Sequence, residues 1–338
     1  MSINVGVIGS DSLIGYEIIK CLEELNDNRI NILCFTNNVG GQEVIQTDYK
    51  MYKLEKLKEE SFDKLDYAIF GNSRNISKKF ACFAVKKGCV VIDNSSFFRM
   101  DKDVPVVCIG SNDKEIFNHK GIISSPNPAT IQLVRSLKIL DDLFGVKKVT
   151  ISTYQSVSGI GKKAVEEYTL NSLIALPSYS AFPYLNSKIH YSIKDNIIPQ
   201  TDDFDVENGY TKEEMEITKE TKKILGNHIN VSSTCVRVPI YRGYGESVSV
   251  ETRGEIDIDL FKEVIKKDNY IELKDDINKQ EYPLVNECYH NKKSIIGRIR
   301  KDLFSDKRLH YFIVGDNLYL GSAYNAVMIL KQLLEKRV

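Results

Sequence analysis

The strongest constraint on the fold is the opening of the chain, where an apolar run leads through a glycine-containing turn into an amphipathic stretch. Residues Ile3 to Ile8 are followed by the turn 9–15 and by helical periodicity to about Leu25. This strand–turn–helix order is typical of the first unit of a Rossmann-type sheet. We expect Gly9 to permit the tight turn and Gly15 to permit close packing of the helix on the strand.

The same turn can be explained without a nucleotide. Ser12 stands where the middle glycine of the fingerprint is expected, and Asp11 can cap the free N–H groups of the helix itself and would repel a pyrophosphate. The loop after the next apolar run, 36–41, has no Lys or Arg to hold a 2′-phosphate. The turn is therefore compatible with two interpretations, a self-capped helix without a nucleotide and a cofactor site.

The alternation of strands and helices continues through the first third of the chain. Further apolar runs at Tyr67–Phe70, Val90–Ile92 and Val104–Ile109, with a helical segment around Ser77–Lys87, predict a mostly parallel, doubly wound sheet up to residue 127. A helix follows from Ile131 to Phe144.

Beyond that helix the pattern changes to β-branched or alternating strands mixed with helices. Strands are predicted at 147–152, 231–239, 247–252, 294–298 and 311–314, and helices near 162–173, 211–225, 259–265 and 321–334. We therefore predict an α/β protein, with a Rossmann-type domain in residues 1–127, completed by a C-terminal helix in 321–338, and a second α+β domain in residues 128–320.

Length and charge narrow the function classes. A chain of 338 residues can hold two domains, and Lys+Arg equals Asp+Glu at 46 each, so no net charge recruits nucleic acid or a membrane surface. No segment is apolar enough to span a bilayer, and the first residues lack the pattern of a signal peptide. The seven cysteines show no CxxC pair and are expected to be buried free thiols of a cytoplasmic protein.

The start of the central helix limits the chemistry of any site there. Asn127 is expected as the N-cap and Pro128 as the first helical residue, where a missing N–H costs nothing. A helix N-terminus aimed at a cleft suits an anion or a thiolate. Pro128 itself cannot be a nucleophile.

Several stretches, in order along nearly the whole chain, resemble aspartate-β-semialdehyde dehydrogenase. The matching stretches are 91–96 with 98–100, 152–159 with 161–166, 207–214, 234–239, 297–302, 316–318 and 325–327. The resemblance implies a two-domain homodimer or tetramer, whose second domain carries substrate and dimer contacts. It also implies the NADPH-dependent reduction of an aspartyl phosphate, with release of phosphate, in amino-acid biosynthesis. In that reaction a cysteine attacks the acyl carbon, a glutamine orients the intermediate and a histidine moves the proton.

Both reacting positions differ here from the family. The family's nucleophile stands in Asn-Pro-Asn-Cys-x-Thr, and its place is taken by Pro128. The histidine's place, seven residues after the substrate arginine, is taken by Tyr244, and a phenol titrating near ~10 is a poor proton shuttle at neutral pH. Ser124, Ser125 and Thr130 are the nearest hydroxyls, for which capping or packing roles are favoured.

Other family positions are retained or altered. Gln155 matches the orienting glutamine, whereas Glu216 reverses the charge of an expected lysine. The substrate-binding residues implied by the resemblance are Arg99, Asn127, Glu213 and Arg237. The implied and degenerate cofactor set is Gly9, Ser12, Gly15, Asn37, Ser158, Gly159 and Asn325, with Met328 in place of a glutamine near the nicotinamide.

Three hypotheses follow. The first is a catalytically silent paralogue that binds a small anionic metabolite or a partner, as a homodimer or as a hetero-oligomer with an active paralogue. The second is an enzyme of altered chemistry on the same scaffold. The third is a working NADP-dependent aspartate-semialdehyde dehydrogenase, against which Pro128 argues; the resemblance implies NADP, and we expect its binding to be weak or absent.

Overall fold

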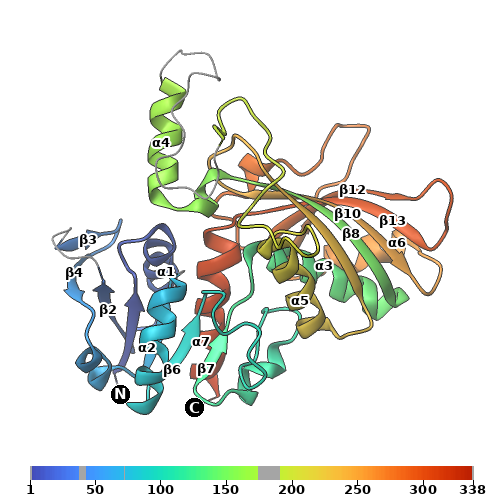
Figure 1. The fold of residues 1–338 in the computed structure, drawn as a ribbon. Helices are drawn as coiled ribbons and strands as arrows, with labels where there is room; N and C mark the ends of the chain where they lie inside the picture. Colours follow the sequence, from blue (N-terminus) through green and yellow to red (C-terminus); the bar gives the residue numbers. More distant parts are fainter. Residues whose placement is uncertain (1, 38–42, 72, 174–190, 337–338) are drawn as a thin grey trace. The chain divides into compact units, whose positions relative to one another are not determined.

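The structure is a computed structural model that describes residues 2–37, 43–71, 73–173 and 191–336. The chain divides into two compact units (Figure 1), one formed by Met1–Asn127 with Ser322–Val338 and the other by Pro128–Gly321.

The first unit is built on a seven-stranded sheet in the order β3-β4-β2-β1-β5-β6-β7. All neighbouring strands are parallel except the edge pair β3–β4, which is antiparallel. The strands are β1 Ile3–Ile8, β2 Ile30–Thr36, β3 Val44–Gln46, β4 Met51–Lys56, β5 Tyr67–Phe70, β6 Val90–Asp93 and β7 Ile122–Ser124. This order confirms the predicted doubly wound, Rossmann-type sheet.

The helices of this unit are α1 Leu13–Glu24, α2 Arg74–Lys86 and α7 Asn325–Glu335, with short 3₁₀ helices at Glu59–Lys64 and Asp113–Asn118. The C-terminal helix α7 packs against α1 and β6. A π-helical turn, Tyr319–Tyr324, leads into it, so the regular helix begins later than the predicted residue 321.

One predicted strand of this unit is wrong. Val104–Ile109 forms a loop with a single bridge from Val106 to Ser124, because Pro105 has no N–H to give to a ladder. The strand that pairs with β6 on the side away from β5 is β7. With only three residues, β7 is too short to be recognised from the sequence.

The second unit is built on a six-stranded mixed sheet in the order β11-β12-β13-β10-β8-β9. Its strands are β8 Val146–Gln155, β9 Asn230–Arg237, β10 Tyr244–Thr252, β11 Ile271–Leu273, β12 Ser294–Lys301 and β13 Arg308–Gly315. Its helices are α3 Pro128–Phe144, α4 Lys162–Leu173, α5 Lys212–Leu225 and α6 Ile258–Lys266, with short 3₁₀ helices at Val157–Ile160 and Val285–Cys288. The predicted α+β character is confirmed.

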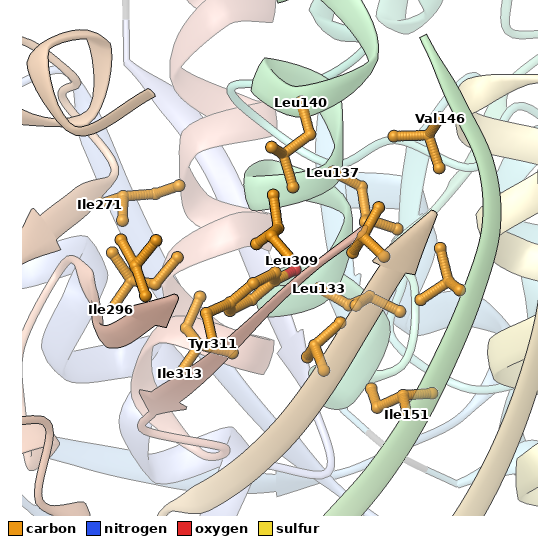
Figure 2. Close-up of a cluster of buried hydrophobic side chains, with 14 of the residues drawn as sticks. Leu133, Leu137, Leu140, Val146, Ile151, Ile271, Ile296, Leu309, Tyr311 and Ile313 are labelled. Carbon is orange, nitrogen blue, oxygen red and sulfur yellow. The ribbon is translucent and has the colours of Figure 1, made fainter. Parts of the chain in front are cut away.

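The core of the second unit lies between one face of this sheet and the helices α3, α5 and α6 (Figure 1). Figure 2 shows Leu133, Leu137 and Leu140 of α3 directed at β-branched and aromatic side chains of the strands. Nearly every residue of the first two turns of α3 is buried, and burial of this apolar surface fixes where the helix begins relative to the strands.

Candidate functional site

Three residues predicted for the site lie side by side across three strands of the second sheet. Gln155, at the end of β8, pairs with Tyr244 on β10 and with Arg237 on β9. All three side chains are buried, and directly paired residues share one face of a sheet. Ala129, the second residue of α3, belongs to the same buried cluster as Tyr244. The fold therefore brings these sequence-distant residues into one row, which we call the site row.

A carboxylate from α5 joins the site row. Gln155 Nε2 donates to Glu213 Oε1 at 3.1 Å and to Thr153 Oγ1 at 3.2 Å. Glu213 is placed by the start of α5, where Thr211 and Glu214 form a capping box. Gln155 Oε1 is buried without a hydrogen-bond partner among the described residues. That oxygen is an acceptor available to a ligand, because buried polar atoms are normally paired.

Arg237 and Tyr244 lie on the two strands that flank Gln155, and both side chains reach Gly159 in the loop after β8. Arg237 Nη1 donates to the Ser156 carbonyl oxygen at 2.6 Å, whereas its Nε, also buried, has no hydrogen-bond partner in the described part of the chain. Burial raises the pKa of Tyr244 to about 12, and the charge of Arg237 only partly opposes this rise. At neutral pH the Tyr244 phenol is therefore a fixed hydrogen-bonding group that keeps its proton.

The loop after β8 covers this pair. A Cβ on Gly159 would overlap the Tyr244 hydroxyl and come within 3.0 Å of Arg237 Nη1. Ser158, which the resemblance assigns to the cofactor, exchanges hydrogen bonds with Asn317, and Asn317 Oδ1 accepts from Gly243 N at 2.8 Å. Ser158 and Gly159 are thus tied to the site row by contacts within the second unit.

An aspartate buried beside this loop fixes the turn that presents Tyr244. Asp316 accepts from Arg242 Nε with both carboxylate oxygens, at 2.9 and 2.8 Å, and from the backbone N–H groups of His290, Leu318 and Tyr319. In the sequence, Asp316 and Asn317 are visible only as part of the stretch 316–318 that resembles the family. Their role in holding residues 242–244 could not be seen without the fold.

Helix α3 begins at Pro128, as predicted. Pro128 is half-buried, and its ring packs on Gly321, where a Cβ would lie 2.6 Å from Pro128 Cβ. The first residue of the central helix therefore presents hydrocarbon instead of a sulfur atom.

The arginine predicted to bind phosphate belongs to the first unit. Arg99 is buried, and it donates to the Ser125 carbonyl through Nε at 3.0 Å and to the Asn94 carbonyl through Nη2 at 2.8 Å. The Asn94 amide is buried with no partner for either side-chain atom among the described residues. Burial raises the pKa of neighbouring Asp93, an effect opposed by hydrogen bonds from Ser95 and Ser77 and by the charge of Arg99. Asn127, the last residue of the N-terminal segment of this unit, is also buried.

The glycine turn has the geometry of a dinucleotide loop. Gly9 has φ +82°, and a Cβ on Gly15 would overlap the Gly9 carbonyl oxygen, as expected for close packing. The space around Gly9 is open, since a Cβ there would meet no atom within 4 Å. The cap of α1 is Ser12, whose Oγ accepts from Gly15 N at 3.0 Å, so the capping role considered for Asp11 belongs to its neighbour. A pyrophosphate would find several N–H groups of the turn already committed, since those of Gly9 and Ser10 donate to the Phe35 carbonyl and that of Gly15 donates to Ser12.

The remaining positions that the resemblance assigns to the cofactor differ in their exposure to solvent. Asn37 is exposed and Met328 half-buried. Asn325 is fully buried: its Nδ2 donates to the Val107 carbonyl and to Ser125 Oγ, both at 2.9 Å, and its Oδ1 accepts from Ile109 N. Both N–H bonds of that amide are committed to the protein, so Asn325 holds the 107–125 region instead of offering a donor to a ligand.

No replacement nucleophile with a base is found in the described part of the chain. Ser124 and Thr130 are fully buried, and neither hydroxyl has a hydrogen-bond partner there. Burial raises the pKa of the Cys235 thiol, which is nearest along the chain to Arg237, well above its usual range. Six cysteines are buried and Cys82 is exposed, contrary to the expectation for all seven.

Neither a histidine nor a metal-binding group is found at the site row among the described residues. His228 pairs with Asp141 and His310 with Asp302, and His190 lies outside the described residues. The described side chains include no group of three or more His, Cys, Asp or Glu placed to hold a metal ion. Nor does any described helix combine the length and apolarity needed to cross a bilayer.

The two sheets and the site row define the class of protein. Residues 4–119 match the NAD binding domain of semialdehyde dehydrogenases, and residues 137–320 match the semialdehyde dehydrogenase dimerisation domain.

Whole-chain relatives then give the family. The chain is 38% identical to aspartate-semialdehyde dehydrogenase of Campylobacter jejuni, covering 98% of this chain and 97% of that protein. It is 35% identical to the Bacillus subtilis protein of the same name, with the same coverage. A crystal structure of aspartate semialdehyde dehydrogenase II from Vibrio cholerae, complexed with ASA, matches with a TM-score of 0.93 and 31% identity over 100% of both chains. The chain belongs to the aspartate-semialdehyde dehydrogenase family.

Proposed function

We propose that this member of the family binds a small carboxylate or phosphate ligand but does not carry out the thiol-dependent reaction that the resemblance implies. The observation that carries the proposal is the start of α3 at Pro128. Covalent catalysis needs an atom with a lone pair at that place, and a prolyl ring has none. Loss of a covalent nucleophile typically lowers the rate by several orders of magnitude.

The second reacting position supports the same conclusion. Tyr244 is 4% exposed and its pKa is raised to about 12. An efficient general acid or base has a pKa near the working pH. A phenol this far from neutrality cannot accept and return a proton in each turnover.

Binding groups are nevertheless kept in both units. In the site row, Arg237 Nε is a buried donor and Gln155 Oε1 a buried acceptor, each without a partner among the described residues. In the first unit, both side-chain polar atoms of Asn94 are likewise buried without a hydrogen-bond partner among the described residues. A ligand carboxylate would pair with Arg237, and a ligand ammonium or hydroxyl would satisfy Gln155 and Glu213. The Asn94 amide offers a second donor to an oxyanion, and the charge of Arg99, which donates to the Asn94 carbonyl, favours an anion there.

The cofactor is proposed from fold and turn geometry. A structure of the Candida albicans enzyme with NADP shares the fold at a TM-score of 0.76, with 20% identity. Gly9 and Gly15 would let the pyrophosphate of a nicotinamide dinucleotide approach the start of α1. The nicotinamide ring of such a cofactor would supply or accept a hydride. Ser12 already occupies the Gly15 N–H, and we therefore expect binding weaker than in a glycine-rich turn.

We propose a homodimer through the face of the second sheet opposite α3, α5 and α6. That face carries small hydroxyl side chains, which let two sheets approach closely. They are Thr150, Ser152, Ser232, Thr234, Ser247 and Ser249, all exposed or half-buried. The match to a dimerisation domain supports this assignment. Ser247→Arg should shift the mass measured by light scattering from dimer to monomer, whereas Lys219→Glu on α5 should leave it unchanged.

A hetero-oligomer with an active paralogue is the related possibility, and co-purification with that paralogue tests it. The cytoplasm is the proposed compartment, since six buried free thiols suit a reducing environment.

The decisive assay follows phosphate-dependent oxidation of aspartate semialdehyde through the absorbance of the NADPH formed from NADP, with the Campylobacter jejuni relative run in parallel. We expect no turnover above background and no covalent acyl adduct by intact mass. Turnover that a thiol reagent abolishes would favour the working enzyme, which the 38% identity over the whole chain keeps as the alternative. Turnover that resists the reagent would favour altered chemistry.

Binding is tested separately by calorimetry with L-aspartate, inorganic phosphate and NADP. Arg237→Ala should weaken L-aspartate binding, and Arg99→Ala should weaken phosphate binding, at least tenfold each. Arg253→Ala, an exposed arginine of the second unit, is the control. Absence of binding to the wild type would leave a purely structural role for both arginines.

A further inference from the structure

Glu246 is a fully buried carboxyl group directly behind the site row. It lies two residues after Tyr244 on β10 and points to the same face of the sheet, beneath α3. Its neighbours across the ladders are Thr153 on β8 and Ile313 on β13. The carboxyl therefore sits between the sheet and the central helix, one row deeper than Gln155 and Tyr244.

Nothing on the elements around Glu246 compensates a negative charge. Neither of its oxygens has a hydrogen-bond partner or an ion-pair partner among the described residues, and Gln132 Nε2 also lacks a partner. Gln132, one helical turn after Pro128, is a side chain close enough to favour the charged form of Glu246. The Gln132 amide also packs on Gly315, where a Cβ would overlap its oxygen.

The other titratable groups between the sheet and α3 do not balance the charge of a Glu246 carboxylate. On α3, the Arg135 guanidinium lies over the Tyr270 ring, 5.0 Å from its centroid. On β13, the Tyr311 hydroxyl is bonded to Ser136 Oγ at 2.7 Å. On β9 and β10, the thiol of Cys235 and the phenol of Tyr244 are acids whose pKa values burial raises. None of them supplies a positive charge to Glu246.

An unpaired carboxylate in a dry core is far costlier than a neutral carboxylic acid. Burial accordingly raises the pKa of Glu246 well above its usual range, and only the Gln132 side chain opposes the shift. The neutral acid is the form that fits this structure.

We propose that Glu246 is a pH-sensitive lock on the start of α3. As a neutral acid it fills the layer behind the site row and keeps the Gln132 turn seated on β13. When pH rises and the proton leaves to solvent, the carboxylate draws water or a cation into this layer and loosens the first turns of α3, which begin at Pro128.

The sign of the effect follows from the raised pKa. The stabilisation is complete below the ordinary carboxyl pKa and is lost as pH rises toward the native pKa of Glu246. Over that window the unfolding constant of the wild type should increase relative to Glu246→Gln by about tenfold for each pH unit. Glu251→Gln is the matched control, because Glu251 is a half-buried carboxylate on the same strand that is paired with Lys147 and Arg308, and these partners lower its pKa.

The experiment combines urea unfolding with hydrogen exchange from acid to mildly alkaline pH. We expect exchange of the first-turn amides of α3, corrected for its intrinsic pH dependence, to accelerate with pH in the wild type and in Glu251→Gln but not in Glu246→Gln. Equal pH dependence in wild type and Glu246→Gln would overturn the proposal.

A direct titration decides the matter even if Glu246→Gln does not fold. Wild-type protein carrying ¹³Cδ-labelled glutamate should keep one neutral carboxyl signal at neutral pH. Glu246→Asp should remove that signal. A Glu246 signal that titrates at the ordinary glutamate pKa would also refute the proposal.

Discussion

The hydroxyl of Tyr244 occupies the volume that a side chain at position 159 would need, so Gly159 and Tyr244 specify each other. The loop 156–159 passes over the phenol and over Arg237, to which it is tied by the Ser156 carbonyl. In this chain the position where the family resemblance expects a proton carrier is thus packed shut by a loop that the same resemblance assigns to the cofactor.

This packing predicts the effect of Gly159→Ala. A methyl group there would overlap the phenol oxygen, and overpacking of this kind costs about 1–3 kcal/mol. Urea unfolding measures the loss. Tyr244→Phe should rescue most of it, because the next atom of the ring lies 3.2 Å from the added Cβ. Costs that simply add in the double mutant would show that the two residues do not share this space.

The phenol itself should be detectable by alkaline titration. The pKa of Tyr244 is raised to about 12, so the fold favours the protonated phenol. That stabilisation is present below pH ~10 and decreases as pH rises toward ~12, by at most about 2–3 kcal/mol. The difference in tyrosinate absorbance between wild type and Tyr244→Phe should show one late-titrating group. A difference spectrum with a midpoint near the ordinary tyrosine value would contradict this assignment.

Restoring the family's residues should not restore activity. Pro128→Cys places a thiol at the start of α3, where the helix lowers its pKa and speeds alkylation. Combined with Tyr244→His, it should give a reactive cysteine but little turnover, since Glu216 remains where a phosphate-binding lysine is expected. Iodoacetamide labelling is best measured in a Cys82→Ser background, because Cys82 is the exposed thiol of the wild type. Rates equal to those of an active relative would show that the rest of the site is intact.

Most of the architecture could be predicted from the sequence, because apolar periodicity reports which faces are buried. The strand β8, the helices α4 and α5, and the start of α3 at Pro128 follow the predicted segments to within a few residues. The edge hairpin β3–β4 is not predicted, since β3 has only three residues and no residue of β4 is fully buried. The segment 104–109, predicted as a strand, shows that an apolar loop can have the sequence pattern of a buried strand. Its Pro105 has no N–H with which to form the hydrogen bonds of a sheet.

The site could be predicted only as a set of positions. Gln155, Arg237 and Tyr244 were identified by resemblance, but their shared register became visible only when β8, β9 and β10 were aligned. The buried state of Glu246 could not be predicted either, because glutamates on strands usually face solvent. Asn325, assigned to the cofactor, has both amide N–H bonds committed to the protein, a fact that no local pattern records.

The turn that presents Tyr244 should depend on Asp316 more than on any surface charge. Asp316 is 1% exposed and accepts from Arg242 and from three backbone N–H groups. Asp316→Asn replaces one acceptor oxygen by an NH₂ group facing these donors, and breaking a buried pair in this way costs about 3–5 kcal/mol. The exposed pair of Lys212 with Asp203 is the control, for which Asp203→Asn should cost no more than about 1 kcal/mol. Both free energies are measured by urea unfolding. Similar losses for the two variants would mean that Asp316 does not hold the turn. A larger loss for Asp316→Asn, together with a lower pKa for Tyr244, would show that the buried pair keeps the phenol protonated and packed.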